Sequence, residues 1–274
     1  MNKESLVLRF LYNTIIGRFI LKIISNRFIS YLVGVFLSCR LSKFLIKPFV
    51  KKNNICLNDY YSNNFKSFND CFSRKIHEQL RPIDMKNDSL ISPSDGCMSA
   101  YHIQDGLVLP VKQSYFTIES LLKDKKLKEE YNDGICLVIR LCVDNYHRYC
   151  YLDSGKKEKN VYIPGKLHTV RPIALEKLSV YTENSREYTI MHTDNFKDVI
   201  QIEVGALLVG KIDNYHEKYS FKKGEEKGKF LFGGSTIILL FKKNAVEVYE
   251  KYFIAGKKNE EIPVKMGERI GASI

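Results

Sequence analysis

Short β-branched and aromatic segments, separated by turn residues, dominate the chain after residue 90. Eight of them follow in order: SLISP, GLVLPV, GICLVIRLCV, YIPGKLHTV, REYTIMHT, DVIQIEVGALLVGKI, FLFGGSTIILLF and AVEVYEKYFI. Such a succession predicts a β-rich and mainly antiparallel core. A single helix is predicted within this part, over residues 117–128 (TIESLLKDKKLK), with Thr117 as its N-cap.

The first 50 residues follow a different pattern, in which apolar clusters alternate with Lys and Arg. Apolar side chains recur at helical spacing at Phe19, Ile20, Ile23, Ile24, Phe28 and Leu32. Cations stand between them at Arg9, Arg18, Lys22, Arg27, Arg40, Lys43 and Lys47. A basic amphipathic region with aromatic residues is typical of a membrane-surface element, and a helical bundle packed on the core is the alternative. The longest apolar run, FISYLVGVFLSC, has about twelve residues, whereas a spanning helix needs about twenty. Together the two patterns predict an α+β protein.

Composition narrows the classes of partner. The 274 residues carry 43 Lys and Arg against 31 Asp and Glu, so the net charge of +12 favours polyanions such as nucleic acid or an anionic membrane. No nucleic-acid-binding motif is visible, which favours the membrane. The seven cysteines are scattered singly without a CxxC pair, so we expect buried thiols in a reducing compartment and no metal site. No cleavable signal peptide is evident.

A Gly-Ser-Thr triplet, residues 234–236, stands between two apolar runs. The run IILLF that follows it predicts a buried strand, so the hydroxyl of Ser235 is expected at a loop-to-strand junction. The carbonyl of Gly234 precedes it, and glycine has no side chain to shield that group. This arrangement suits attack by a serine on its own preceding peptide bond. An ordinary turn serine is the other interpretation, and for an isolated GGST it is the commoner one.

Six segments in order resemble motifs of the phosphatidylserine decarboxylases, the pyruvoyl-dependent lipid enzymes. They are FNDCFSRKIHEQLRPID (68–84), ISPSDG (91–96), YHR (146–148), GKLHTVRP (165–172), VGALLVGKI (204–212) and KGEEKGKFLFGGSTIILLF (223–241). Any one of them is weak, but six collinear motifs are specific. The resemblance covers about residues 5–250.

The resemblance implies a proenzyme with a membrane-associating helical region, residues 1–50, and a catalytic domain, residues 51–274. It implies self-cleavage between Gly234 and Ser235 into a β chain and an α chain, with Ser235 becoming a covalent pyruvoyl group. That group would form a Schiff base with phosphatidylserine and act as the electron sink for loss of CO₂, which leaves phosphatidylethanolamine. We therefore expect a peripheral protein on the cytoplasmic side of the cell membrane.

The family's self-cleavage relay maps onto Asp95 and Ser235, but its histidine does not map onto a histidine. Many members have YHRxH, and this chain has Cys150 at the second histidine position. A thiol with an ordinary pKa is a poor base at neutral pH. His147, within the matched YHR, and His168, in GKLHTV, therefore remain two candidates for the base.

Arg148 is a candidate for binding the lipid phosphate or carboxylate, and a strand-pairing arginine is the equal alternative. Two other functions stay open at this point. One is a pyruvoyl decarboxylase of a soluble amino acid, and the other is a non-catalytic membrane-binding homologue.

Overall fold

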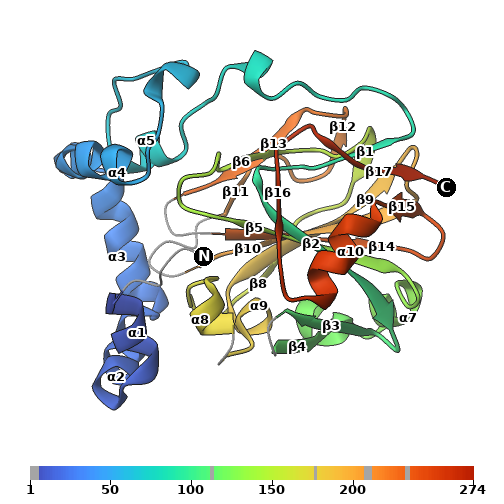
Figure 1. Ribbon diagram of the computed structural model, residues 1–274, viewed down its shortest axis with the longest axis horizontal. Coiled ribbons are helices and arrows are strands. Elements are labelled where there is room, and N and C mark those ends of the chain that lie inside the picture. The colour runs from blue at the N-terminus through green and yellow to red at the C-terminus, as the bar shows by residue number, and fades with distance from the viewer. Residues whose placement is uncertain (1–5, 112–113, 176–177, 207–211, 232–234) are drawn as a thin grey trace.

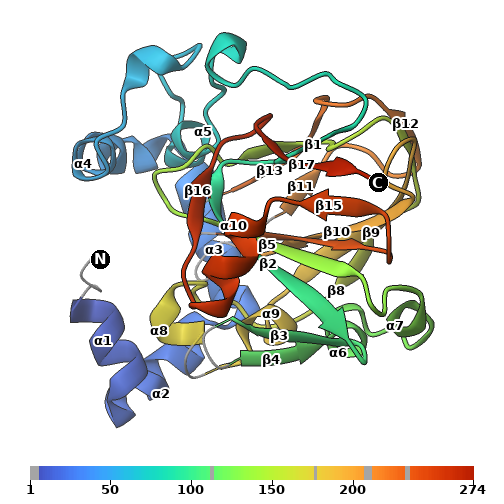
Figure 2. The ribbon, with the colours of Figure 1, turned by 45° about the vertical axis from the view of Figure 1, so that its right-hand side comes forward.

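The computed structural model describes all residues except 1–5, 112–113, 176–177, 207–211 and 232–234. The first helices form a column along one side of a β-rich body, and a long segment then crosses the top of that body to reach the first strand (Figure 1). In Figure 2, after a turn of 45°, part of the helical column overlaps the body, so its separation is best seen in Figure 1. The α+β class predicted from the sequence is confirmed, while a domain boundary at residue 50 stays a prediction.

The N-terminal helices are short and are separated by polar caps. They are α1 (Leu6–Asn13), α2 (Ile15–Ile24), α3 (Arg27–Ser38), η1 (Arg40–Leu45) and α4 (Ile46–Lys52). The Thr14 hydroxyl accepts the N–H of Gly17 at 2.9 Å, and the Asn26 amide oxygen accepts that of Phe28 at 2.8 Å. Each cap starts a new helix and so divides the amphipathic region. Among the described residues no single helix is long and apolar enough to cross a membrane, although Ile15–Ile24 and Phe28–Ser38, bent by 66°, pass that test as a pair.

A polar stretch with η2 (Leu57–Asp59), α5 (Phe68–Phe72) and η3 (Glu78–Leu80) leads from these helices to the body. Helix α5 packs against α3, where Leu37, Phe68 and Phe72 form a small buried cluster. The Ser67 hydroxyl caps α5, as expected for serine before a helix. This contact attaches the helical column to the segment that enters the first strand.

The body is built around an eleven-stranded antiparallel sheet, whose main path runs β12-β7-β9-β10-β14-β5-β2-β3-β4, with β16 beside β2 and β8 beside β9. These strands are β2 (Gly96–Gln104), β3 (Leu107–Val111), β4 (Ser114–Thr117), β5 (Ile135–Leu141), β7 (Gly155–Lys157), β8 (Val161–Ile163), β9 (Arg186–Thr193), β10 (Asp198–Val204), β12 (Tyr219–Phe221), β14 (Ser235–Phe241) and β16 (Ile262–Val264). Two three-stranded sheets complete the body. They are made of β1 (Ser89–Ile91), β17 (Arg269–Ser273) and β15 (Val246–Val248), and of β11 (Ile212–Asn214), β13 (Glu226–Phe230) and β6 (Arg148–Cys150).

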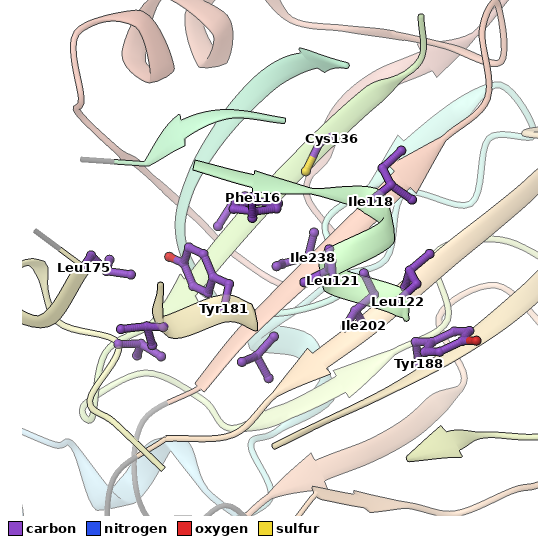
Figure 3. Close-up of a cluster of buried hydrophobic side chains, with 14 of the residues drawn as sticks. Phe116, Ile118, Leu121, Leu122, Cys136, Leu175, Tyr181, Tyr188, Ile202 and Ile238 are labelled. Atoms are coloured by element: carbon purple, nitrogen blue, oxygen red, sulfur yellow. The ribbon is translucent and has the colours of Figure 1, made fainter. Parts of the chain in front are cut away.

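Strand β14 lies in the middle of the main sheet, and every one of its residues is buried. Its side chains alternate between two cores, as the two-residue period of a strand requires. Ile238 and Leu240 enter a core with Phe116, Tyr181 and Leu121, which Figure 3 shows. Ile237, Leu239 and Phe241 enter a second core on the other face. The predicted buried strand is confirmed, and burial on both faces explains its continuous apolar sequence.

Short helices pack their buried side chains into the two cores on the faces of the main sheet. They are α6 (Ile118–Leu122), α7 (Lys126–Glu130), α8 (Pro172–Leu175), α9 (Val180–Glu183) and α10 (Glu250–Lys257). The single helix predicted over residues 117–128 is therefore two helices. Thr117 caps the first of them, as predicted, through a capping box with Ser120. Lys123 then takes a left-handed backbone conformation with φ of 56°, which ends the helix.

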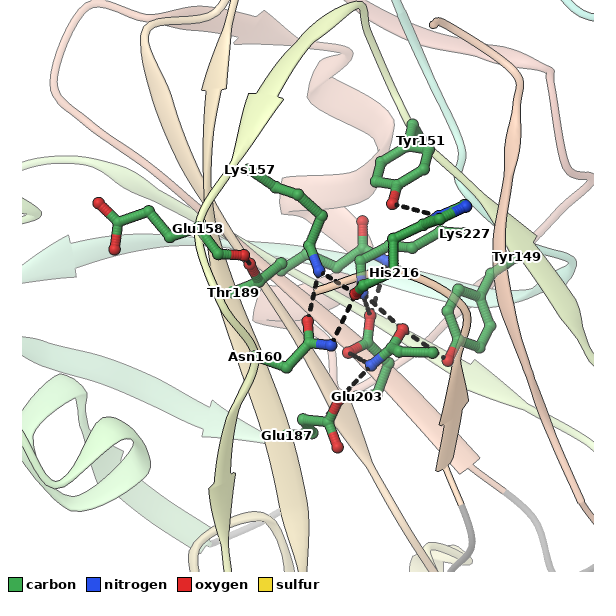
Figure 4. Close-up of polar contacts among 12 residues, drawn as sticks. Tyr149, Tyr151, Lys157, Glu158, Asn160, Glu187, Thr189, Glu203, His216 and Lys227 are labelled. Carbon is green, nitrogen blue, oxygen red and sulfur yellow. Dashed lines mark hydrogen bonds and ion pairs between the residues drawn. The ribbon is translucent and has the colours of Figure 1, made fainter. Parts of the chain in front are cut away.

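A buried polar cluster fills the space between the main sheet and the β11-β13-β6 sheet. Lys227 and Glu203, both fully buried, form an ion pair of 2.7 Å. Asn214 bonds to Lys227 and to Glu187, and Lys157 bonds to Asn160 nearby (Figure 4). Because buried charges are stable only when paired, this cluster fixes β13 over β10.

Candidate functional site

Ser235 is the first residue of β14 and is fully buried. Its backbone pairs with Leu141 at the end of β5. By alternation its side chain shares a face with Ile237, on the side of the core that contains Tyr149 and Phe230. The hydroxyl has no hydrogen-bond partner among the described residues. A buried hydroxyl without a partner is costly in a merely structural role, so this geometry favours a chemical role.

His147 lies in the turn that follows β5. Backbone contacts connect this turn to residues on both sides of the predicted cleavage bond. The N–H of Phe230 donates to the His147 carbonyl at 2.9 Å, while Leu141 pairs with Ser235. His147 therefore lies within a turn that starts beside Ser235 and ends beside β13. Gly234, the other residue of the predicted bond, lies outside the described residues.

The hydrogen bonds of His147 define which ring nitrogen can accept a proton. Nδ1 lies 2.9 Å from the Asn145 carbonyl, and a carbonyl only accepts, so Nδ1 carries the proton. Nε2 is then the unprotonated nitrogen, whose lone pair can accept a proton. It is buried without a hydrogen-bond partner among the described residues. Burial, aided by the positive charge of Arg74, lowers the pKa of His147 to about 3. The ring is thus neutral at physiological pH, as a general base must be.

Arg74 holds this turn in place from a fully buried position. Its guanidinium donates to the carbonyls of Asp144 and Asn145, at 3.0 and 3.4 Å, and to two carbonyls of α5. Asn145 is also the acceptor for His147 Nδ1, so one carbonyl is oriented by both groups. Arg74 lies within the motif FNDCFSRKIHEQLRPID, which by itself predicts no role for it. Its place in that motif was the available signal.

Asp95 is buried at the start of β2 and is bound by an arginine. Arg81 donates to its carboxylate through Nε at 2.6 Å and a terminal nitrogen at 2.5 Å, and the N–H of Met266 adds a third bond at 3.0 Å. No bond between Asp95 and a histidine is present among the described residues. Arg81 belongs to the RPID motif, which does not by itself predict a contact with Asp95.

Cys150 lies against the loop that contains Asp95, because its N–H donates to the Pro93 carbonyl at 2.9 Å. The position at which many family members have a histidine is therefore next to the aspartate's loop. Burial raises the pKa of the Cys150 thiol to about 12, so the thiol is protonated and cannot replace that histidine as a base.

His168 is connected to the neighbourhood of Ser235 through Asn184, but its ring lies elsewhere. The Asn184 amide donates to the carbonyls of His168 and Gly205, both at 2.7 Å. The ring lines a cavity of about 580 Å³ together with residues of α1 and α2, and its Nε2 is 3.8 Å from the Glu183 carboxylate. Burial lowers the pKa of His168 below its usual value.

Arg148 is engaged by protein groups. Its guanidinium donates to the Ser73 carbonyl at 2.8 Å and to Glu226 at 2.7 Å. Glu226 lies on β13, the strand beside β6, so this pair links the two strands. A role in substrate binding stays a prediction, and it requires Arg148 to exchange one of these partners.

Comparison with known proteins adds independent information. The family model described as phosphatidylserine decarboxylase matches residues 68–272. The chain belongs to the phosphatidylserine decarboxylase family.

Similar members of this family come from clostridia. Phosphatidylserine decarboxylase proenzyme 2 of Clostridium acetobutylicum is 47% identical over 96% of this chain and 91% of its own length. The phosphatidylserine decarboxylase proenzyme of Ruminiclostridium cellulolyticum is 41% identical over 98% of this chain and 91% of its own. That of Clostridium botulinum strain Hall is 40% identical over 96% and 92%.

An apolar groove of about 590 Å³ separates α3 from the edge of the main sheet in this family member. It is lined from α3 by Tyr31, Gly34 and Val35 and from the body by Ser185, Glu187 and Leu231. Val204 pairs with Arg186 on β9 and with Thr236 on β14, so the next row across β9, β10 and β14 consists of Ser185, Gly205 and Ser235. Because opposed residues share a face and Gly205 has no side chain, this row connects the groove to the side-chain face of Ser235.

Proposed function

We propose that this chain is a phosphatidylserine decarboxylase proenzyme that cleaves itself between Gly234 and Ser235. The mature protein then converts phosphatidylserine to phosphatidylethanolamine and CO₂. The observation that carries this proposal is the buried Ser235 hydroxyl, without a described partner, beside the turn that contains a neutral His147, in a member of this family. Incubation with phosphatidylserine vesicles should release CO₂, whereas free serine should not. Turnover of free serine alone would instead indicate a soluble-substrate decarboxylase.

Self-cleavage needs only groups of this chain. Ser235 Oγ loses its proton to a base and attacks the Gly234 carbonyl carbon. The new C–O bond replaces the peptide C–N bond, and the proton passes to the amine, which leaves an ester. Removal of the Ser235 α-proton then expels the Gly234 carboxylate. Hydrolysis of the remaining dehydroalanine releases ammonia and leaves the pyruvoyl group at the start of the α chain.

We propose His147 as the base for the first step. Its Nε2 is the unprotonated nitrogen, and His147 belongs to the turn that starts at the residue paired with Ser235, whereas the His168 ring lines a cavity next to Glu183. The carbonyl of Asn145 orients the ring, which is the task that an aspartate has in many relays. Asp95, bound by Arg81 through both carboxylate oxygens, would then hold the loop before β2 in place and would not bond directly to the base.

The position of Ser235 fits a covalent pyruvoyl group. Its side chain is fully buried at the head of a central strand, and the row through Gly205 leads from it to the groove. A pyruvoyl group there would supply the electron sink for loss of CO₂. The surrounding apolar side chains would exclude water from it, which protects a reactive carbonyl.

The groove between α3 and the sheet is the proposed path of the lipid headgroup. Its α3 wall presents Tyr31, Gly34 and Val35 between Ser30 and Ser38, a mainly apolar surface that suits the glycerol and upper acyl region of a phospholipid. Its body wall includes Ser185 and Glu187, so the polar end of the ligand would point toward the sheet. The lipid could then react at Ser235 without leaving the membrane completely.

Arg74→Met tests the assignment of the base through pH. Arg74 helps to lower the pKa of His147, so its loss should raise that pKa toward 6.5. A base works only above its pKa. Processing slows at low pH because the base becomes protonated, and the pH at which this happens, the acid limb of the rate profile, should be higher in the variant. The rate is followed by gel analysis of freshly synthesised chain at a series of pH values.

Lys75→Met is the matched control for that experiment, because Lys75 is the exposed neighbour of Arg74. It should leave the acid limb unchanged. A lower processing rate in Arg74→Met with no shift of the limb would mean that Arg74 acts only on folding, and an Arg74→Lys chain should retain the wild-type limb if charge is the cause.

The N-terminal helices carry the surface that we propose binds an anionic membrane on the cytoplasmic side. Large apolar side chains are exposed along them at Leu6, Phe10, Ile15, Ile16, Phe19, Ile20, Ile23, Phe28, Tyr31, Leu32, Val35, Phe36, Leu41 and Phe44. An apolar surface of this extent is unusual on a monomer in water. The Lys and Arg residues between these positions supply the attraction to anionic lipid, about 1 kcal/mol for each cation near the surface.

Replacing two of these side chains should weaken vesicle binding. Ile16→Asp with Phe19→Asp removes two exposed apolar groups from α2, each contributing about 1.5–3 kcal/mol when fully buried in a lipid layer. We expect sedimentation with phosphatidylserine-containing vesicles to fall by about tenfold or more. Ile254→Asp on α10, 44% exposed and on the body, is the matched control and should sediment as wild type. An equal loss of vesicle binding in the double variant and in Ile254→Asp would mean that net charge alone accounts for binding.

A further inference from the structure

Two thiols and a guanidinium meet on β2 and β5, apart from the groups assigned above. Cys97 pairs with Arg140 in the register of these strands. A terminal nitrogen of Arg140 lies 3.1 Å from the Sγ of Cys142, two residues further along the same face, so the two thiols are diagonal neighbours across the strand pair. Arg140 pairs with Thr236, whose side chain alternates with that of Ser235, so this cluster lies on the opposite face of the sheet.

The surroundings of the two sulfurs shift their pKa values in opposite directions. The neighbouring Cys97 thiol and the charge of Arg140 lower the pKa of Cys142 to about 6, against burial and the nearby Asp144. The same interaction raises the pKa of Cys97. Glu261 accepts from Arg140 at 2.9 Å and keeps its guanidinium in place. The charge of Arg140 therefore favours a thiolate at Cys142 and leaves Cys97 as the thiol.

The other cysteines lack this environment. Cys71, Cys136 and Cys150 are buried, and burial raises the pKa of each. Cys39 and Cys56 are exposed, and no contact between them and another thiol occurs among the described residues. Cys97 and Cys142 are half-buried, so a small oxidant can reach the pair.

We propose that Cys97 and Cys142 form a peroxide-sensitive dithiol site, with Cys142 as the attacking sulfur and Cys97 as the resolving sulfur. The Cys142 thiolate attacks one peroxide oxygen, the O–O bond breaks, and hydroxide leaves as a sulfenic acid forms. The Cys97 sulfur gives up its proton and attacks the Cys142 sulfur, so that an S–S bond replaces the S–O bond and water leaves. The two thiols lose two electrons, and hydrogen peroxide is reduced to two waters.

The bridge would connect two segments that bear on Ser235. Cys97 follows Asp95 by two residues, and Cys142 begins the turn that leads to His147. Because neighbouring thiols must approach to about 2.05 Å to bond, oxidation would draw the turn toward β2.

The test is to treat the purified full-length protein briefly with hydrogen peroxide, block remaining thiols with iodoacetamide, and map the digested peptides by mass spectrometry. We expect a peptide linked through Cys97 and Cys142 that dithiothreitol reverses. Cys142→Ser should lose it, and Cys97→Ser should leave a sulfenic acid at Cys142 that dimedone traps. Cys56→Ser, which removes an exposed thiol, should keep the linkage.

A second measurement does not depend on disulfide formation. The alkylation rate of Cys142 should be nearly constant above about pH 7, whereas that of a free cysteine peptide rises about tenfold per pH unit below a pKa of about 8.5. Equal pH dependence at Cys142 and in the peptide would overturn the assignment of the thiolate. Peroxide treatment that links other cysteines, or that leaves Cys142 unmodified, would overturn the dithiol site.

Discussion

A chain with Ser235→Ala is expected to remain a single full-length polypeptide. The substitution removes the hydroxyl that attacks Gly234 and also removes the source of the pyruvoyl group, so both processing and decarboxylation should be lost completely. Denaturing mass spectrometry of the purified protein measures the first, and CO₂ release from phosphatidylserine vesicles measures the second. The wild-type chain should give two masses, and its α chain should be blocked to Edman sequencing.

Ser99→Ala separates this loss from a folding defect. Ser99 is another buried serine of the main sheet, on β2, and should process normally. The mechanism fails if Ser235→Ala still yields cleavage at this bond. It also fails if the wild-type chain, given time and correct folding, stays intact.

The second large effect is expected at His147. Loss of a general base costs about 10²–10⁴-fold in rate, so His147→Ala should process at least about a hundredfold more slowly. His168→Ala should process at close to the wild-type rate, because its ring lines the cavity beside α1 and α2. The measurement is the half-time of conversion from one chain to two, with the melting temperature of each variant as a check on folding.

The opposite result is equally informative. If His168→Ala abolishes processing and His147→Ala does not, His168 is the base and the turn around His147 has a structural role. Placing a histidine at the family position, Cys150→His, in the chain that fails should then restore part of the rate. Pro93 brings that position beside the loop of Asp95, so such a histidine could contact the carboxylate.

Local sequence was sufficient to predict most of the strands, because each depends mainly on the chemistry of its own segment. The segment AVEVYEKYFI was predicted as a strand, but only Val246–Val248 form one (β15), and Glu250–Lys257 form helix α10. The run IILLF could be assigned to a buried strand without knowing its neighbours, and β14 confirms it. The prediction of one helix over residues 117–128 was wrong in one respect, because the helix breaks at Lys123. The left-handed conformation there is taken by a lysine, so no glycine or proline marks the break in the sequence.

The contacts of the site depended on chain segments that are far apart, and motifs alone did not predict them. Arg81 and Asp95 each stood within a motif, yet their ion pair follows only from the path of the segment between α5 and β1. The partner of Arg148 is Glu226, from a strand 78 positions later. The groove is likewise a product of tertiary packing, because neither α3 nor β9 forms it alone.

The central place of β14 has a consequence for the mature protein. Once the bond before Ser235 is cut, the α chain consists of β14 together with the elements after it, and β14 remains hydrogen-bonded to β5 and β10 of the other chain on both sides. The two products are thus interleaved from the moment they arise and share one hydrophobic interior. They never meet as separate subunits, so dilution should not dissociate them, and denatured products mixed together would have to insert a strand into the middle of a finished sheet. Activation of this enzyme is then a one-way event within a folded molecule.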